Sequence, residues 1–221
     1  MENYMNDYLT IALPKGKLFT ISKNLLHRVG LSADHLSEKS RKLVIENEDL
    51  KVRFIIAKTS DVPTYVEYGA ADIGIIGKDV LLESQKDVYE ILDLGFGKCH
   101  LMMAVPQKEK RRRLLDYSYT RVATKYPHIA ESFFARQGMQ MEYIKLNGSI
   151  ELGPIVGLSE SIVDIVETGT TLAENDLEEI AHILDVSARL IVNRVSFKLK
   201  FHRINEIINN LRPIIESGEI L

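Results

Sequence analysis

The sequence has a single cysteine, Cys99, no tryptophan and no long apolar run. One cysteine excludes an internal disulfide framework and a thiolate-rich metal site, and it is typical of a protein of the reducing cytosol. The apolar clusters are strand-sized, well short of the roughly 20 residues that a membrane helix needs. The first residues, MENYMNDYLTIALPKG, lack the basic and apolar regions of a signal peptide. We therefore expect a cytoplasmic protein with no membrane segment.

The chain also lacks an excess of positive charge, since its 221 residues carry a formal net charge of -3. No overall field favours nucleic acid, so we expect no nucleic-acid partner. The basic run QKEKRRR, residues 107–113, is typical of a solvated loop, and binding of phosphate or nucleic acid is the alternative. The histidines are scattered without metal-ligand spacing, so the sequence predicts no metal site built from them.

Short β-branched runs alternate with amphipathic stretches along the whole chain, which predicts an α/β fold with mixed, mainly parallel sheets flanked by helices. We expect strands at residues 9–13, 52–57, 73–77, 88–95, 100–105, 121–124, 141–146 and 161–166. We expect helices at residues 19–29, closed by Gly30, from residue 78, at 129–138, from about Leu172 through the acidic stretch AENDLEEI, and at 197–217.

The stretch DIVETGTTL, residues 164–172, leads from a β-like run into a loop of glycine and threonine. Gly169 allows close approach of a ligand, and successive backbone N–H groups before a helix form an anion-binding nest. Thr168, Thr170 and Thr171 add hydroxyl donors. These features favour a phosphate site, and a surface helix capped by threonine is the alternative.

Two carboxylates, Asp164 and Glu167, accompany this loop and do not suit a phosphate. They suit the vicinal hydroxyls of a ribose or a hydrated magnesium ion, and we favour the hydroxyls. Residues three apart in a strand point to opposite faces, so a turn starting at Val166 or Glu167 is needed to bring both to one ligand. The combination predicts a site for a ribose 5-phosphate.

The segment VDIVETGTTL resembles the 5-phosphoribosyl-1-pyrophosphate (PRPP) loop of the ATP phosphoribosyltransferase family. Five further segments resemble that family in the same order, and they are IALPKGKLF, DVPTYVEYGAADIGIIGKDVL, LDLGFGKCHLMMAVP, VATKYP and IKLNGSIELGP. The resemblance extends from about Leu9 to Phe197. Each segment alone is a weak signal, but the ordered set is specific.

The resemblance implies that adenine N1 of ATP attacks C1 of PRPP and displaces pyrophosphate, with Mg²⁺ as cofactor, in the first step of histidine biosynthesis. The reaction needs cations for the leaving pyrophosphate and for two polyanionic substrates in one cleft. Lys15 and Lys17 flank Gly16 after the first predicted strand, a suitable turn for phosphate contacts. Two exposed surface lysines are the alternative, and the family often has arginine where Lys17 stands.

Arg41 and Lys58 are our candidates for assisting the leaving pyrophosphate. Arg53 lies within an apolar strand, where an unpaired charge would be unfavourable, so it either binds phosphate or sits at a solvent edge. Asp61 is a possible N-cap of the helix that begins in DVPTYV.

Two glycine-containing segments complete the candidate site. Gly74 and Gly77 follow apolar residues and would let a nucleotide approach the backbone, although a plain strand followed by a helix also accounts for them. The turn Asn147-Gly148-Ser149, before an expected helix, would line the same cleft, and an ordinary Asn-Gly turn is the alternative.

The resemblance further implies a two-lobed fold like that of type II periplasmic binding proteins, with the active site in the cleft between lobes. One lobe would combine residues 1–95 and 185–221, and residues 96–184 would form the second lobe with the PRPP loop. No C-terminal regulatory domain follows, which indicates the short form. That form implies a regulatory partner resembling histidyl-tRNA synthetase in a hetero-oligomer, and a dimer of catalytic chains.

Two other functions remain open from the residues. A cytosolic two-lobed ligand-binding or sensor protein would share the fold and could hold phosphate without turnover. A phosphoribosyltransferase for a free base usually has two adjacent acids before the Thr-Gly segment. Here Ile165 and Val166 separate Asp164 from Glu167, which disfavours that class.

Overall fold

The computed structural model describes residues 8–31, 33, 36–37, 42–109 and 113–218. The chain divides into two compact units, and it passes between them twice. Unit 1 consists of Met1–Gly97 and Ser187–Leu221, and unit 2 of Lys98–Val186. In the described part of the chain, no helix combines the length and apolar character required to cross a bilayer.

Unit 1 contains a six-stranded mixed sheet in the order β2-β3-β1-β4-β11-β5. Its strands are β1 (Leu9–Pro14), β2 (Val44–Asn47), β3 (Val52–Ala57), β4 (Ile73–Gly77), β5 (Tyr89–Asp93) and β11 (Ala188–Val192). The central strands β3, β1 and β4 are parallel. Strands β2 and β11 pair antiparallel to their neighbours, and β5 pairs antiparallel to β11. The three central strands therefore end at one edge of the sheet.

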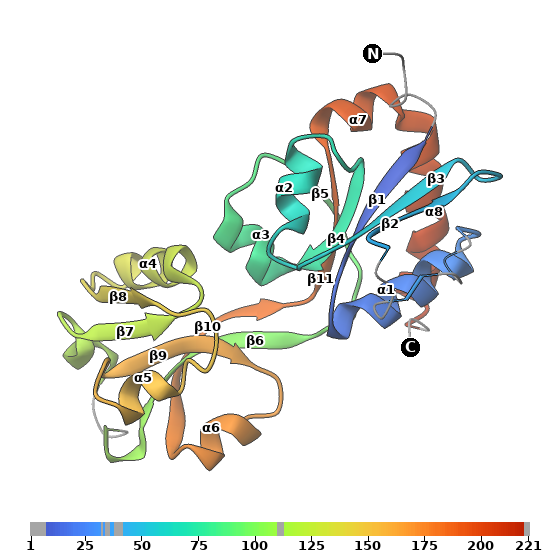
Figure 1. Cartoon of the computed structure of the whole chain (residues 1–221). Coiled ribbons are helices and arrows are strands. Elements are labelled where there is room, and N and C mark those ends of the chain that lie inside the picture. The colour runs from blue at the N-terminus through green and yellow to red at the C-terminus, as the bar shows by residue number, and fades with distance from the viewer. Residues whose placement is uncertain (1–7, 32, 34–35, 38–41, 110–112, 219–221) are drawn as a thin grey trace. The chain divides into compact units, whose positions relative to one another are not determined.

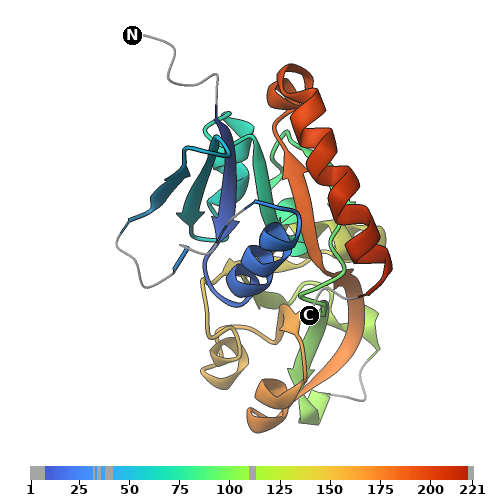
Figure 2. The same ribbon diagram turned by 90° about the vertical axis from the view of Figure 1, so that its right-hand side faces the viewer.

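Helices cover both faces of this sheet (Figure 1). The helices of unit 1 are α1 (Lys17–Arg28), α2 (Val62–Glu67), α3 (Lys78–Ser84), α7 (Arg194–Leu199) and α8 (Phe201–Glu216). Helices α1 and α8 bury apolar side chains against one face, and Figure 2 shows the length of α8 beside the sheet. Helix α2 packs on the other face against β1, β4 and β11.

The expected end of α1 is confirmed. Gly30 has a φ of +81°, and its N–H donates to His27 O at 3.0 Å. The N–H of Leu31 donates to Leu26 O, also at 3.0 Å. These two bonds form a Schellman motif, for which glycine is the favoured residue because of its positive φ.

Unit 2 contains a five-stranded mixed sheet in the order β10-β6-β9-β7-β8. Its strands are β6 (Cys99–Pro106), β7 (Arg121–Thr124), β8 (Glu142–Lys145), β9 (Ser161–Val166) and β10 (Leu177–Val186). Its helices are α4 (Pro127–Arg136), α5 (Leu152–Ile155) and α6 (Thr170–Glu174), with 3₁₀ turns at Gln107–Glu109 and Leu114–Tyr117. Helix α4 lies on one face, and α5 and α6 lie on the other (Figure 1).

Two expectations about the helices are wrong. The helix expected from Leu172 starts at Thr170 and ends at Glu174, and the following stretch forms β10 instead. Pairing with β6 overrides the helical pattern, because Ile180, Ile183 and Leu184 pack against the core of unit 2. The helix expected at 197–217 is two helices, which break at Lys200.

Parallel pairs also do not predominate, since five of the nine strand pairings are antiparallel. The sheets are mixed, as expected. The antiparallel neighbours include β2, which returns through a hairpin, and β10 and β11, which follow one another where the chain passes back into unit 1.

Candidate active site

The first group of predicted site residues lies where the parallel strands of unit 1 end. Strands β1, β3 and β4 end at Pro14, Ala57 and Gly77. In open α/β sheets, ligands bind outside the carboxyl ends of the strands. The predicted lysines Lys15 and Lys58 directly follow two of these ends, so they share one edge of the sheet.

The turn of Lys15, Gly16 and Lys17 is fixed by backbone bonds and is exposed to solvent. The N–H of Lys15 donates to Ala57 O at 2.8 Å, and the hydroxyl of Thr59 donates to Lys15 O at 3.2 Å. Gly16 is the N-cap of α1 with a φ of +90°, a conformation that other residues rarely adopt. The turn therefore presents two lysines from a rigid backbone beside the end of β3.

Lys58 is exposed at the same edge, and its carbonyl accepts the N–H of Asp61 at 2.9 Å. Asp61 is the N-cap of α2, as expected, but its side chain makes no capping bond and instead accepts from the Ser60 hydroxyl at 3.0 Å. Arg41, the other predicted catalytic cation, lies outside the described residues.

Arg53 is not brought to this edge. It is the second residue of β3, roughly 16 Å from Lys58 along an extended strand. Its Nε donates to Glu46 Oε1 of β2 at 2.6 Å, and its guanidinium lies 5.1 Å from the centroid of the Tyr8 ring. The ion pair satisfies the charge within the strand without a ligand, so phosphate binding by Arg53 stays a prediction.

The two predicted glycines of β4 are enclosed by protein atoms. A Cβ on Gly74 would lie 2.8 Å from Val66 Cγ2 and 2.9 Å from Val62 Cγ1, both of α2. A Cβ on Gly77 would lie 2.1 Å from Asp79 Oδ1. Packing against α2 therefore requires Gly74, whereas a side chain at Gly77 would displace the Asp79 carboxylate. The approach of both glycines to a nucleotide stays a prediction.

The second group of predicted site residues lies where the parallel strands of unit 2 end. Strands β7, β8 and β9 are parallel and end at Thr124, Lys145 and Val166. The loops that follow β8 and β9, residues 146–149 and 167–169, therefore leave the same edge of the sheet. The sequence alone could not show this, because it does not give the strand order.

The loop after β9 passes through a left-handed glycine into a short helix. Gly169 is the N-cap of α6 in the left-handed region, with a φ of +76°. No side chain caps this helix, so the threonines have not been used as caps. Thr168, Thr170 and Thr171 are exposed, and the hydroxyls of Thr168 and Thr170 lie 3.0 Å apart. The hydroxyl groups are thus gathered at the solvent-facing start of α6.

The two carboxylates take different positions beside this loop. Asp164 is half-buried in β9 opposite Met102, and alternation places it on the sheet face of Ile162 and Val166, which α6 covers. Strand β9 ends at Val166, and the chain bends at Glu167. The predicted ligand site needs a turn at this point to bring both carboxylates to one ligand. Glu167 is exposed in the first position after the strand.

The turn Asn147-Gly148-Ser149 is exposed and leads into α5, as expected. Ser149 has a φ of +49° and its carbonyl accepts the N–H of Leu152 at 3.1 Å. The N–H of Leu146 donates to Thr124 O at 3.0 Å, which ties this turn to the end of β7. The turn therefore belongs to the same edge as the threonine loop.

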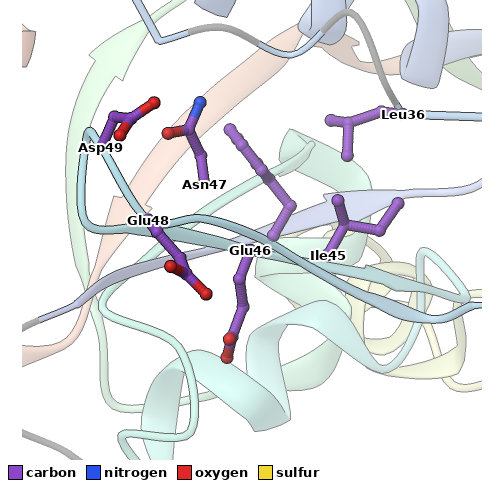
Figure 3. Close-up of a pocket in the computed structure, with 7 residues that line it drawn as sticks. Leu36, Ile45, Glu46, Asn47, Glu48 and Asp49 are labelled. Atoms are coloured by element: carbon purple, nitrogen blue, oxygen red, sulfur yellow. The ribbon is translucent and has the colours of Figure 1, made fainter.

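A pocket of about 230 Å³ lies elsewhere, at the hairpin between β2 and β3 (Figure 3). Its lining residues are Leu36, Ile45, Glu46, Asn47, Glu48, Asp49 and Phe54. The hairpin precedes Val52, the first residue of β3, so the pocket is at the opposite end of that strand from Lys58. Its acidic lining does not suit a phosphate.

Three further lysines lie at these edges and were not predicted from the sequence. Lys78 follows β4 and pairs with Glu90. Lys98 precedes β6 and Lys125 follows β7, and both are exposed in unit 2. In the sequence, each of these lysines directly follows or precedes an apolar strand, and this position could have indicated them.

Comparison with known proteins identifies the family. Residues 58–213 match the family described as HisG, ATP phosphoribosyltransferase. A protein named ATP phosphoribosyltransferase from Desulfitobacterium hafniense (strain Y51) is 53% identical over 216 residues, covering 95% of this chain and 97% of the relative. Its counterpart from Lachnoclostridium phytofermentans (strain ATCC 700394 / DSM 18823 / ISDg) is 52% identical over 215 residues, covering 96% and 99%.

Solved structures agree with this result. The structure titled ATP phosphoribosyl transferase (HisG:HisZ) complex from Thermotoga maritima has a TM-score of 0.80 and 33% identity, covering 95% of this chain and 99% of that chain. A substrate binding protein of an amino acid ABC transporter has a TM-score of 0.63 at 12% identity, covering 96% and 95%, which shows the fold alone. The expected two-lobed α/β fold and the resemblance noted in the sequence are both confirmed. The chain belongs to the ATP phosphoribosyltransferase family.

Proposed function

We propose that this chain carries out the reaction of its family with the two sheet edges described above. Adenine N1 of ATP attacks C1 of PRPP, the C1–O bond to pyrophosphate breaks with its electron pair, and N1-(5-phosphoribosyl)-ATP and pyrophosphate leave. The observation that carries the proposal is the loop after β9, with exposed threonines around a left-handed Gly169. Because adenine N1 has its own lone pair, the chemistry depends on positioning and charge more than on a base.

The loop of unit 2 is the proposed PRPP site. Backbone N–H groups and hydroxyls of residues 168–171 would bind the 5-phosphate, which ordinarily takes such donors at a strand-to-helix turn. Asp164 and Glu167 would accept hydrogen bonds from the ribose hydroxyls. Asn147, Gly148 and Ser149, from the neighbouring edge loop, would line the substrate site.

The edge of unit 1 supplies cations. Lys15 and Lys17, held around Gly16, would bind phosphates of ATP, and Lys58 together with Arg41 would stabilise the leaving pyrophosphate. The exposed positions of Lys15, Lys17 and Lys58 at one sheet edge support this assignment.

Magnesium is the divalent cation that we propose to accompany PRPP. Over the residues that the structure describes, no three His, Cys, Asp or Glu side chains are grouped as a metal site. Asp164 and Glu167 are the carboxylates beside the proposed loop, and Mg²⁺ commonly binds one or two carboxylates together with substrate phosphates. These residues fit a cation that arrives with the substrate. Such an ion supplies positive charge to the departing pyrophosphate.

The proposed partner is a regulatory subunit resembling histidyl-tRNA synthetase, in a hetero-oligomer with dimers of the catalytic chain. The support is the Thermotoga maritima relative, whose structure is titled as a HisG:HisZ complex. Histidine would then act through the partner. We also propose a cytoplasmic location, where ATP is available.

In the deciding experiment, the purified chain is mixed with ATP, PRPP and magnesium. Formation of the phosphoribosyl-ATP adduct is monitored by its ultraviolet absorbance. It is run with and without the regulatory subunit. We expect product, and we expect Thr170→Ala and Asp164→Ala to reduce it by at least about tenfold through loss of binding contacts. Free adenine and orotate, offered in place of ATP, are expected to give none.

A ligand-binding protein without turnover is the alternative from a different class, because solute-binding proteins share the fold. Calorimetric binding of PRPP without product under either condition would favour that alternative. Product from a free base would instead favour the third class, a base phosphoribosyltransferase.

A further inference from the structure

The proposed PRPP loop is surrounded by negative charge. Asp164 and Glu167 belong to the loop and its strand, and a third acid approaches from β10. A Cβ on Gly169 would lie 3.9 Å from Glu179 Oε1, and Glu179 Oε2 lies 3.6 Å from His100 Nε2. PRPP carries a phosphate and a pyrophosphate, and nearby carboxylates disfavour the binding of such an anion. Unit 2 therefore needs cations of its own at this edge.

The cations predicted from the sequence are all in unit 1, so they do not meet this need within unit 2. Unit 2 has other basic residues, but several are placed elsewhere. Arg121 begins β7 at the opposite edge and is paired with Glu160 at 2.6 Å. Lys108 follows the carboxyl end of β6, and β6 is antiparallel to β9, so it is also at the opposite edge.

Strands β6 and β7 flank β9 in the sheet (Figure 1), and Lys98 and Lys125 adjoin them, because Lys98 precedes β6 and Lys125 follows β7. Lys98 precedes Cys99, where β6 begins, and His100 lies opposite Val166, the last residue of β9. Lys125 follows Thr124, the last residue of β7, and Thr124 lies opposite Val163 of β9. This register places Lys98 level with the loop after β9 and Lys125 level with Asp164, each about 4.8 Å to one side of β9.

The backbone around Lys125 is firmly held. The buried Thr124 hydroxyl donates to Val163 O at 2.7 Å and accepts the N–H of Tyr126 at 2.9 Å. The Thr124 carbonyl accepts the N–H of Leu146 at 3.0 Å. The Lys125 ammonium lies 5.7 Å from the centroid of the Tyr126 ring, a contact that leaves its N–H donors available to an anion.

Both lysine side chains are exposed, and neither forms an ion pair with any residue in the described ranges. Arg121 and Lys78, in contrast, each have an acidic partner. An exposed lysine without an ion pair has no carboxylate to give up when it binds an anion. The pair is therefore suited to a ligand and not needed for the fold.

We propose that Lys98 and Lys125, one from each strand beside β9, bind the anionic oxygens of PRPP and offset the acids around its loop. This assignment rests on the proposed function, because it presumes that residues 164–171 hold PRPP. Both lysines act as point charges on flexible stems, so they follow the phosphate and pyrophosphate groups. They are binding residues for PRPP and not for ATP.

The test uses Lys98→Met and Lys125→Met, singly and together, which remove the charge and keep much of the apolar stem. Lys108→Met is the matched control, because it removes an exposed lysine of the same unit at the opposite edge. PRPP with magnesium is titrated calorimetrically into each chain, and KM for PRPP and ATP is measured with the regulatory subunit present.

Each single variant is expected to raise the Kd and KM for PRPP by about tenfold, and the double variant by more, with KM for ATP within about twofold of wild type. Lys125→Arg is expected to restore most of the affinity, because it keeps the charge. Lys108→Met is expected to match wild type. The control for folding is thermal unfolding, and each variant is expected to unfold at the same midpoint temperature as wild type.

Three results would overturn the assignment. In the first, the double variant binds PRPP with wild-type affinity while Thr170→Ala binds it weakly. The proposed function would then stand, but the two lysines would have no role in PRPP binding. A larger effect on KM for ATP would place the lysines on the other substrate. A wild-type chain that neither binds nor converts PRPP would refute the proposed function itself, and the inference with it.

Discussion

Gly169 shows how one residue fixes the candidate loop. Its φ of +76° lies in the left-handed region, where a residue with a Cβ is strained by about 1–2 kcal/mol. The nearest atom to an added Cβ is 3.9 Å away, so space does not oppose alanine there. Gly169→Ala is therefore expected to lower the free energy of unfolding by about 1 kcal/mol and to raise KM for PRPP, because relief of the strain reshapes the loop.

Urea denaturation and steady-state assays measure both effects, and Gly148→Ala is the stability control. Gly148 does not have a positive φ, and a Cβ there meets nothing within 4 Å. An unfolding free energy unchanged in Gly169→Ala would show that the turn accepts a side chain.

Gly74 allows packing and binding to be separated at a single position. A methyl group there would crowd Val62 and Val66 of α2 and Ile191 of β11, the last at 3.1 Å. Overpacking of this kind ordinarily lowers stability by about 1–3 kcal/mol. We expect Gly74→Ala to unfold at lower urea while its KM for ATP stays within about twofold at temperatures where it is folded.

A large rise in KM for ATP without loss of stability would contradict the packing role and support the nucleotide contact predicted from the sequence. Val62→Ala combined with Gly74→Ala is the matched variant. Removal of the crowded methyl groups is expected to recover part of the stability, because the two sites are in contact.

The pairing of β7 with β9 begins at an ion pair between Arg121 and Glu160. The Glu160 carboxylate accepts a hydrogen bond from the backbone N–H of Arg121 at 2.8 Å and another from the guanidinium of Arg121 at 2.6 Å. The hydrogen bond from the Arg121 side chain is the main reason that the pKa of Glu160 lies below its usual value of 4.5. A carboxylate with a lowered pKa in the folded state stabilises the protein above pH 4.5, and this stability is lost as pH falls through the lowered pKa.

Glu160→Gln is therefore expected to be less stable than wild type at pH 7, by up to about 1 kcal/mol because the pair is partly exposed. The difference should shrink as the pH falls from about 4.5, where the unfolded chain begins to bind the proton, through the lowered pKa of Glu160 in the folded protein. Unfolding by urea from pH 3 to 8 measures it. Glu131→Gln, an exposed glutamate of α4, is the control, and an equal loss in both variants would argue against the ion pair.

The elements that could be predicted are those whose pattern is local. Residues 52–57 and 73–77 were predicted at their observed bounds because nearly every residue is apolar, as befits strands at the centre of a sheet. β10 was missed because its acidic residues follow a helix start in the sequence. Its register depends on β6, more than 70 residues earlier in the chain, which no local pattern shows.

The candidate site divides in the same way. The loop of residues 164–171 could be predicted, because glycine, threonine and acid are chemically distinctive. The charge partner of Arg53 could not, since Glu46 meets it only through antiparallel pairing of β2 with β3. Lys98 and Lys125 also required the strand order, because β9 lies between β6 and β7 in the sheet but follows both of them in the sequence.

At the scale of the whole molecule, the two units differ in how the chain builds them. Unit 2 is one continuous segment with apolar clusters on both faces of its sheet. Unit 1 is completed only when the chain returns at Ser187, because β11 lies between β4 and β5. Helix α8 then covers the sheet with four buried side chains, Ile204, Ile207, Ile208 and Leu211.

A chain that ends at Val186 is therefore expected to lose the fold of unit 1 and keep that of unit 2. It lacks four buried side chains of α8, each of which stabilises the fold by about 1.5–3 kcal/mol, and β5 loses its partner strand. Hydrogen exchange of backbone amides is the measurement. Amides of β6, β7 and β9 should stay protected while those of β1, β3 and β4 exchange rapidly. Protection of β1 and β3 in the shortened chain would show that residues 1–97 form a stable core without the returning segment. The sheet edge that carries Lys15 and Lys58 would then also form without it.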